Sequence, residues 1–370
     1  MIRITQQDSA GAAKSYYATA DYYSEGQELV GSWGGKGASR LGLEGTVDKF
    51  SFERLCDNLD PRTGKPLTVR TRTERTVGYD FTFSVPKSVS LLFAMSGDQG
   101  IMEAFRGAVD DTMREIEAEM KTRVRKGRQD TDRTTGNMVW AEFIHTTSRP
   151  VDGIPDPQLH AHVFTFNTTW DDEEHRWKAG QFRELKRDAP YFQAAFRVRL
   201  AGKLQDLGFG VERKRDDFEI AGIPADVMKR FSRRTAVIEK VAEEKGITDP
   251  KRKAELGAET REKKESALSW ESLRKEWNAR LTDREHNTLA AVHRRERDIP
   301  RPERGETAAV DHATQHSFVR EAVVPERKLV TEALKRGIGA VTVEGVTGEV
   351  SKRPLIRSEV AGRKMATTKE

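Results

Sequence analysis

The spacing of apolar residues predicts two long helices in the first two thirds of the chain. Apolar side chains recur every three to four positions over residues 98–124 and again over residues 189–207, as on the buried stripe of an amphipathic helix. Gly208 follows the second stripe, where a glycine commonly ends a helix. Residues 10–23 and 86–95 predict two shorter helices.

Runs with a two-residue period predict strands between these helices. They cover residues 76–84, 137–146 and 158–168. A loop rich in proline joins the last two runs, and such a connection favours antiparallel neighbours. Residues 31–49 are rich in glycine and basic side chains, which indicates loops and turns. Up to about residue 222 the pattern therefore indicates one α+β domain.

Beyond residue 222 the chain becomes more charged. Residues 228–245 and 251–264 predict helices that bury little, and residues 298–307 form a proline-rich, charged linker. The last 63 residues, 308–370, predict a small unit of two helices with a β-rich tail around residues 341–350. We therefore expect a main domain over residues 1–240, a charged helical flap over residues 241–300, and a linker with the start of a further module over residues 301–370.

Composition limits the class of protein. The 370 residues include 64 basic and 59 acidic side chains, a net charge of +5 that only hints at a polyanionic partner. One cysteine, Cys56, excludes an internal disulfide framework and a cysteine-cluster metal site. No apolar run approaches the ~18–20 residues of a spanning helix, and residues 1–20 lack a signal-peptide core. We expect a soluble, intracellular protein that does not insert into membranes.

Three of the eight histidines lie within one short window. His160 and His162 share one face of a predicted strand, roughly 7 Å apart along it, and His145 ends the neighbouring strand. Three imidazoles on one sheet face make an open metal site with positions left for water or substrate oxygens. The alternative is a set of surface or hydrogen-bonded strand histidines.

Asp80 lies in the middle of another predicted strand. A buried carboxylate there is costly without a partner. The partner is either the ring N–H of a metal-bound histidine or a tyrosine hydroxyl. The alternative is an aspartate on the exposed face of a surface strand.

Four of the six tyrosines form two adjacent pairs near the N-terminus: Tyr16 and Tyr17, then Tyr22 and Tyr23. Such pairs are ordinarily packing or interface residues. A tyrosine hydroxyl becomes a nucleophile when a base or a metal-polarised substrate assists it, and this chain holds candidates for both. Attack on a phosphodiester would displace a 3′ oxygen and leave a 5′-phosphotyrosine whose bond energy is kept for rejoining.

Three strings in this order carry a family resemblance. They are SYY with DYY at residues 15–23, YDFTFSVPKSVS at residues 79–90, and PQLHAH at residues 157–162. Over roughly residues 1–240 the chain resembles the MobF conjugative relaxases, the TraI/TrwC-type members of the HUH endonuclease superfamily. The resemblance implies an α+β fold with a central antiparallel sheet flanked by helices, followed by a mostly helical flap and extension.

The resemblance also implies roles for the residues named above. Tyr16 would nick the transfer origin, Tyr22 would perform a second strand transfer, and Tyr17 and Tyr23 would support them. His145, His160 and His162 match the metal triad, and Asp80 matches the acidic residue that orients a metal histidine or takes the tyrosine proton. The metal would be Mg²⁺ or Mn²⁺, with Zn²⁺ and Ni²⁺ also open.

The implied partners are those of plasmid mobilisation. They are single-stranded origin-of-transfer DNA with an adjacent hairpin, relaxosome accessory proteins and a type IV secretion coupling protein. The protein would act in the donor cytoplasm and be transferred with the DNA. Residues 317–370 resemble the stretch ahead of the helicase with which family members continue, and the chain holds no GxxxxGK[ST] motif, so we expect nicking without unwinding.

Basic and aromatic side chains near these motifs are the candidates for binding DNA. They are Trp33, Lys36, Arg40, Arg70, Arg72, Arg75, Arg125, Lys126, Arg128, Arg197 and Arg199. Three other functions stay open on the residues alone: a rolling-circle replication initiator with the same chemistry, a three-histidine hydrolase or oxygenase, and a DNA-binding scaffold without chemistry.

Overall fold

The computed structural model describes most of the chain. It covers residues 2–18, 28–69, 75–249, 252–253, 256–257, 268–293 and 305–368, without the side chains of residues 16–18 and 28–30. Within these residues no helix is both long and apolar enough to cross a bilayer.

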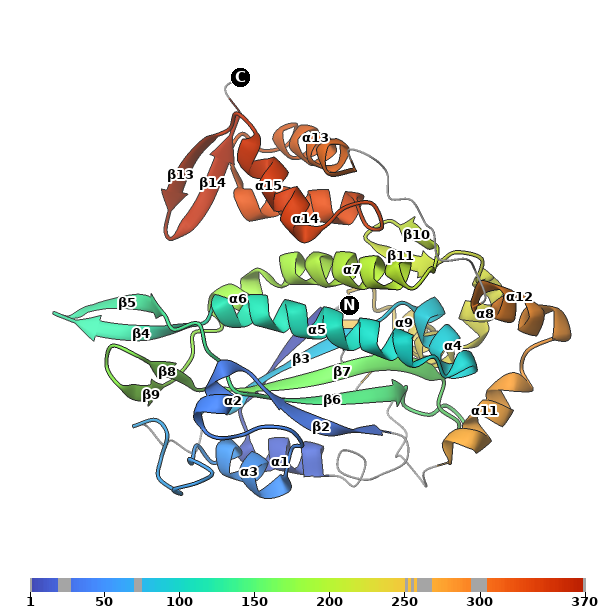
Figure 1. The fold of residues 1–370 in the computed structure, drawn as a ribbon, viewed down its shortest axis with the longest axis horizontal. Coiled ribbons are helices and arrows are strands. Elements are labelled where there is room, and N and C mark those ends of the chain that lie inside the picture. The colour runs from blue at the N-terminus through green and yellow to red at the C-terminus, as the bar shows by residue number, and fades with distance from the viewer. Residues whose placement is uncertain are drawn as a thin grey trace.

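The centre of the fold is a five-stranded antiparallel sheet (Figure 1). Its strand order is β1 (Ile2–Gln7), β3 (Gly78–Ser84), β7 (Pro157–Phe166), β6 (Trp140–Thr147) and β2 (Glu28–Gly34). Every neighbouring pair is antiparallel, as predicted for β6 and β7. The period-2 alternation of β7 gives the sheet two apolar faces, since Leu159, Ala161 and Val163 enter one core and Phe164 and Phe166 another.

Helices cover both faces of the sheet. One face packs under α4 (Lys87–Ser96), α5 (Gln99–Ala118) and α7 (Ala189–Asp206), and the other over α1 (Ala10–Ala18), α2 (Lys36–Arg40) and α3 (Lys49–Cys56). Figure 1 shows α5 and α7 above the sheet and α1 and α3 below it. This arrangement confirms the predicted α+β class with a central antiparallel sheet flanked by helices.

Two predicted element boundaries are wrong. The helix expected over residues 98–124 ends at Ala118, and the chain continues as the hairpin β4 (Lys121–Lys126) and β5 (Gln129–Thr134). Residues 31–49 hold most of β2 and all of α2. Glycine is needed at Gly34 because a Cβ there would lie 2.2 Å from the Trp140 ring.

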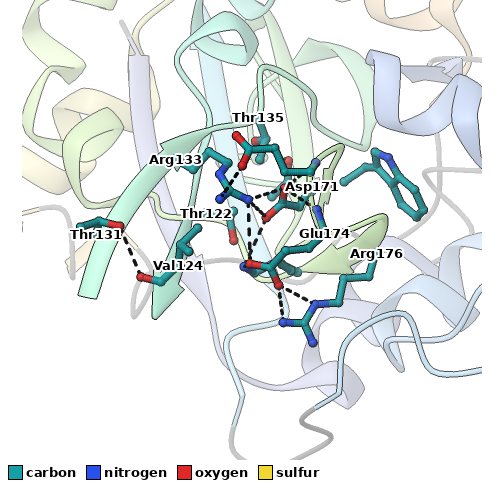
Figure 2. A network of polar contacts seen from close by, with 12 residues as sticks. Thr122, Val124, Thr131, Arg133, Thr135, Asp171, Glu174 and Arg176 are labelled. Carbon is teal, nitrogen blue, oxygen red and sulfur yellow. Dashed lines mark hydrogen bonds and ion pairs between the residues drawn. The ribbon is translucent and has the colours of Figure 1, made fainter. Parts of the chain in front are cut away.

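A second hairpin packs against the first. β8 (Thr169–Asp171) and β9 (Arg176–Lys178) lie beside the base of β4, where Thr122 bridges to Gly180. Asp171 is fully buried and accepts from Arg133 Nη1 at 2.9 Å and Lys178 Nζ at 3.3 Å (Figure 2). The short helix α6 (Arg183–Arg187) then leads into α7.

The segment after α7 is a hairpin followed by helices. The hairpin consists of β10 (Val211–Lys214) and β11 (Asp217–Ile220). The helices that follow it are α8 (Ala225–Arg230), α9 (Arg233–Glu244), α11 (Trp270–Asn278) and α12 (Asp283–His293). α8, α11 and α12 contact α4. Leu273, Trp277, Leu289 and Val292 are buried, so these helices bury more than their charge suggests. Most of residues 251–264 and 298–304 lies outside the described residues.

Residues 305–368 have the element order of a winged helix. α13 (Gly305–Phe318), β12 (Val324–Pro325), α14 (Glu326–Arg336) and α15 (Val343–Lys352) precede the wing strands β13 (Ile356–Val360) and β14 (Arg363–Thr367). The three strands form one sheet in the order β12-β14-β13. The β-rich tail expected around residues 341–350 is therefore wrong, because Val343, Val346 and Val350 are the buried stripe of a helix.

This winged unit is attached to α7. Val330 and Leu334 of α14 belong to the same apolar core as α7. Arg327 pairs with Asp188 at 2.8 Å and with Glu119, and its guanidinium lies 4.3 Å from the centre of the Tyr191 ring. The prediction of a small unit at this point is compatible with the fold, and the three domain boundaries stay predictions.

Replacing Arg327 by Ala tests that attachment. We expect the free energy of unfolding to fall by about 1–2 kcal/mol. This loss is smaller than for a fully buried ion pair, because about a third of the Arg327 side chain is exposed. Lys328→Ala is the matched control because Lys328 pairs with Glu321 in a more exposed setting, for an expected loss of under ~0.5 kcal/mol. Equal losses in urea unfolding would show that Arg327 does not hold the unit in place.

Candidate active site

Three histidines meet on the face of the sheet that α1 and α3 cover. His145 on β6 stands directly opposite His160 on β7, and His162 follows two residues later on the same side. The ring centres are 5.1 Å apart for His145 and His160, 5.2 Å for His160 and His162, and 5.4 Å for His145 and His162. The structure therefore brings together the three histidines that the sequence singled out.

Hydrogen bonds orient two of the three rings. His162 Nδ1 donates to Asp80 Oδ2 at 2.7 Å, and His160 Nδ1 donates to the carbonyl oxygen of Gln158 at 2.9 Å. Because both acceptors favour a proton on Nδ1, the lone pair of each neutral ring lies on Nε2. Burial, with the neighbouring His145 and His162, holds the pKa of His160 well below its usual value, so this ring is neutral at physiological pH.

These residues fit a divalent cation by their donor type. Imidazole nitrogens bind zinc at ~2.0–2.1 Å, so rings that share one ion have centres roughly 5 Å apart. As the side chains stand, no three described His, Cys, Asp or Glu residues are closed around one point. The spacing of the three ring centres nevertheless fits a shared ion, and the assignment of these histidines as ligands stays a prediction.

Asp80 is buried at the centre of β3. Its side chain is 6% exposed, and its Oδ2 atom accepts the hydrogen bond from His162. The carboxylate therefore has a histidine ring as its partner, and the role of that ring as a metal ligand stays a prediction. Its other oxygen, Oδ1, is buried and has no hydrogen-bond partner among the described residues, which leaves an acceptor at the site.

The first tyrosine pair belongs to α1. Residues 16 and 17 lie in the last turn of this helix, and Ala13 of the same helix is buried in the core beneath the histidine face. Strand β1 precedes α1 and places Thr5 opposite Asp80. The side chains of Tyr16 and Tyr17, and all of Tyr22 and Tyr23, lie outside the described residues, so their roles stay predictions.

Three of the residues predicted to bind DNA have partners within the protein. Arg197 is 3% exposed and pairs with Asp217 at 2.6 Å, and Arg199 pairs with Glu115 at 2.6 Å and contacts Thr112. Trp33 is 9% exposed and packs against the core residue Phe166. The prediction for Arg197 is corrected, because its buried guanidinium is not available to a DNA strand, whereas those for Arg199 and Trp33 stay predictions.

The other predicted DNA contacts lie on surfaces or outside the described residues. Lys36, Arg40, Arg125, Lys126 and Arg128 are exposed. Arg40 pairs with Asp172 at 2.9 Å and lies over the Trp170 ring. Arg70 and Arg72 are not described.

A basic cleft beside the two hairpins contains two of the predicted DNA contacts, Arg75 and Arg125, together with basic residues that sequence reasoning missed. Its volume is about 800 Å³, and its lining comes from β4, β5 and β9, from residues 68, 69, 75 and 76, and from Asn167 at the end of β7. Its cations are Arg75, Arg123, Arg125, Arg176 and Lys178, and Trp177 adds an aromatic surface. Alternating basic residues in KTRVRK and the RWK triplet were the available signals. The cleft is near the end of β7 opposite to His160, roughly 15–20 Å along the strand.

Comparison with known proteins agrees with this geometry. A family model described as TrwC relaxase matches residues 10–284. The chain belongs to the TrwC relaxase family. The conjugative relaxase TrwC in complex with oriT DNA, in its metal-bound structure, has a TM-score of 0.67 at 31% identity and covers 79% of this chain and 98% of its own. A copper-bound TrwC structure reaches 0.68 at the same identity and coverage.

Two further relatives of this TrwC-family chain differ in how much of their own length it spans. TrwC complexed with a 27-mer DNA comprising the recognition hairpin and the cleavage site has a TM-score of 0.66 at 30% identity over 79% of this chain and 98% of its own. The multifunctional conjugation protein TraI of Escherichia coli strain K12 is 34% identical over 248 residues. That match covers 64% of this chain but spans only 14% of TraI.

Proposed function

We propose that this chain is the relaxase part of a conjugation protein, which nicks one DNA strand at a transfer origin and later rejoins it. The observation that carries the proposal is the triangle of His145, His160 and His162 with Asp80 bonded to His162, on the sheet face that the tyrosine helix covers. Relatives with this fold at about 31% identity are relaxases in complex with oriT DNA.

The reaction we assign is a transesterification. The hydroxyl oxygen of Tyr16 forms a bond to the scissile phosphorus, the bond from phosphorus to the 3′ oxygen breaks, and the hydroxyl proton ends on that 3′ oxygen. The product is a 5′-phosphotyrosine and a free 3′-hydroxyl, and the reverse reaction rejoins the strand. Tyr22 is the candidate for the second transfer, with Tyr17 and Tyr23 in support.

The described residues prepare the site for this chemistry. His145, His160 and His162 would hold a divalent cation, which when bound stabilises negative charge on the phosphate oxygens. Asp80 fixes the tautomer of His162 through Oδ2, and its Oδ1 atom is an acceptor for a hydroxyl proton. Metal-bound and copper-bound TrwC structures support a divalent ion without deciding which one acts here.

The proposed partners follow from the relatives. Single-stranded origin DNA with its hairpin is the substrate that the TrwC complexes support. Relaxosome accessory proteins, a type IV coupling protein, action in the donor cytoplasm and transfer to the recipient belong to the same proposal. Detection of a covalent protein–DNA adduct tests the nicking reaction on which the rest of the proposal depends, and absence of the adduct from the wild-type protein would refute that reaction.

We assign the basic cleft to the origin hairpin because a phosphate backbone needs cations and the cleft is remote from the histidines. Replacing Arg123 and Arg125 together by Ala is expected to weaken binding of a hairpin oligonucleotide about tenfold and to lower the salt dependence by roughly two counterions. Arg363→Ala with Lys364→Ala removes the same charge from the wing and should change affinity less than about twofold. Fluorescence anisotropy across salt concentrations measures the affinity and its salt dependence for both double variants. Equal effects of the two would show that only the net charge matters and that the cleft does not bind the hairpin.

A further inference from the structure

The five residues that lead into the histidine strand are each held by a separate hydrogen bond. We call residues 154–158 the approach segment, since it ends the loop from β6 and contains the first two residues of β7, stopping two residues before His160. Arg233 Nη2 donates to the carbonyl of Ile154 at 2.6 Å, and Trp277 Nε1 donates to that of Pro155 at 2.9 Å. Lys87 Nζ donates to the carbonyl of Pro157 at 2.8 Å, and His160 Nδ1 donates to that of Gln158 at 2.9 Å.

Asp156 is the centre of this arrangement. Its side chain is 2% exposed, and its Oδ1 atom accepts from Arg280 Nη1 at 2.8 Å and from Arg233 Nε at 3.0 Å. Its Oδ2 atom accepts from the backbone N–H of Arg233 at 2.9 Å. A carboxylate buried this deeply is stable only while both cations stay in place, so it fixes the segment to the helices that supply them.

Those helices come from far along the chain. Arg233 opens α9, Trp277 is in α11 and Arg280 follows α11, whereas the segment belongs to the loop between two sheet strands. Trp277 is fully buried, and Arg280 lies over the ring of Phe231 at 5.6 Å. The helices after residue 225 therefore bind the backbone of the approach segment, which includes the Gln158 carbonyl that accepts the hydrogen bond from His160.

We propose that Asp156, held by Arg233 and Arg280, is a positioning residue that sets the orientation of His160 for metal binding. The inference rests on the proposed function, because it takes His160 to be a ligand. A shift of the approach segment moves the Gln158 carbonyl, and the Nδ1–H bond that presents Nε2 is then lost or redirected. Partners that orient a ligand histidine in this way change metal affinity by roughly 10–100-fold when removed.

The test compares Asp156→Asn with a matched variant, Asp171→Asn. Asp171 is also buried and also binds two cations and a backbone N–H, but it lies in the hairpin network at the other end of the sheet (Figure 2). Mn²⁺ alone is titrated into each metal-free protein and the free ion is followed by electron paramagnetic resonance. We expect both variants to lower the melting temperature, but only Asp156→Asn to weaken Mn²⁺ binding, by roughly tenfold.

Two further measurements keep the inference falsifiable. Trp277→Phe removes the bond to Pro155 while keeping an aromatic ring in the core, and it should weaken Mn²⁺ binding roughly threefold, even if Asp156→Asn does not fold. Nuclear magnetic resonance of the metal-free protein should show His160 as the Nδ1–H tautomer in the wild type and a mixture in Asp156→Asn. Unchanged affinity and tautomer in folded Asp156→Asn would overturn the positioning role.

The same titration separates this inference from the proposed function. His160→Ala should abolish tight Mn²⁺ binding; if it does not, the metal assignment fails and the role of Asp156 fails with it. If His160→Ala abolishes binding but Asp156→Asn leaves it unchanged, only the positioning role fails. A wild-type protein that binds Mn²⁺ but forms no DNA adduct would refute the relaxase function and leave the role of Asp156 intact.

Discussion

Tyr16→Phe lowers the rate of DNA nicking by on the order of 10³-fold or more and removes the covalent adduct, if Tyr16 is the nucleophile. The substitution keeps the ring but deletes the only atom able to form the bond to phosphorus. The measurement is a denaturing gel of protein incubated with Mn²⁺ and a labelled single-stranded oligonucleotide that carries the origin hairpin and cleavage site. An adduct that survives SDS should be seen for the wild type and not for Tyr16→Phe.

Companion variants assign the other tyrosines. Tyr22→Phe should leave the first nick intact and slow the second strand transfer, measured with a second oligonucleotide that accepts the covalently bound strand. Tyr191→Phe is the control, because Tyr191 is buried and bonded to Glu115, remote from the histidine face. An adduct that persists in the variant lacking hydroxyls at Tyr16, Tyr17, Tyr22 and Tyr23 would rule out these tyrosines as nucleophiles. Cleavage that persists in this variant without any adduct would favour a three-histidine hydrolase.

The histidine face was predictable because it depends on strand periodicity alone. Side chains two apart share a face, so His160 and His162 had to lie with Phe164 and Phe166, and the short loop made His145 a neighbour. A partner for Asp80 was also expected, because a buried carboxylate in mid-strand needs one, but the sequence left a histidine ring and a tyrosine hydroxyl open, and the structure shows His162. The distances and angles between the three imidazole rings could not be predicted, because they depend on contacts between strands.

Other features could not be predicted from the sequence because the local pattern indicated one structure and tertiary contacts favoured another. Met120 and Val124 continue the helical spacing of α5, but Gly127 and Arg128 have positive φ and turn the chain into a hairpin. Arg197 resembled a DNA contact by charge alone, since its partner Asp217 comes from a hairpin formed later in the chain. Arg233 and Arg280 bind Asp156 from about 80 and 120 positions further along the chain, and no short sequence motif spans such distances.

His162→Ala is expected to lower the nicking rate by on the order of 10²–10⁴-fold while the affinity for the origin hairpin changes less than about threefold. The reason is that the basic cleft, which we assign to the hairpin, is remote from the histidines. Asp80→Asn keeps the shape of the side chain but no longer favours the Nδ1–H tautomer of His162, so we expect a roughly 10–100-fold loss that added Mn²⁺ partly restores.

His312→Ala is the matched control for this series, because His312 stacks on His316 in α13 and is remote from the sheet. It should nick at the wild-type rate. Chelation with EDTA should reduce wild-type nicking to the level of His162→Ala and leave His162→Ala itself unchanged, because both treatments remove the same cation. If EDTA instead slows His162→Ala as much as it slows the wild type, the cation acts at another place and the three histidines serve only to position the strand.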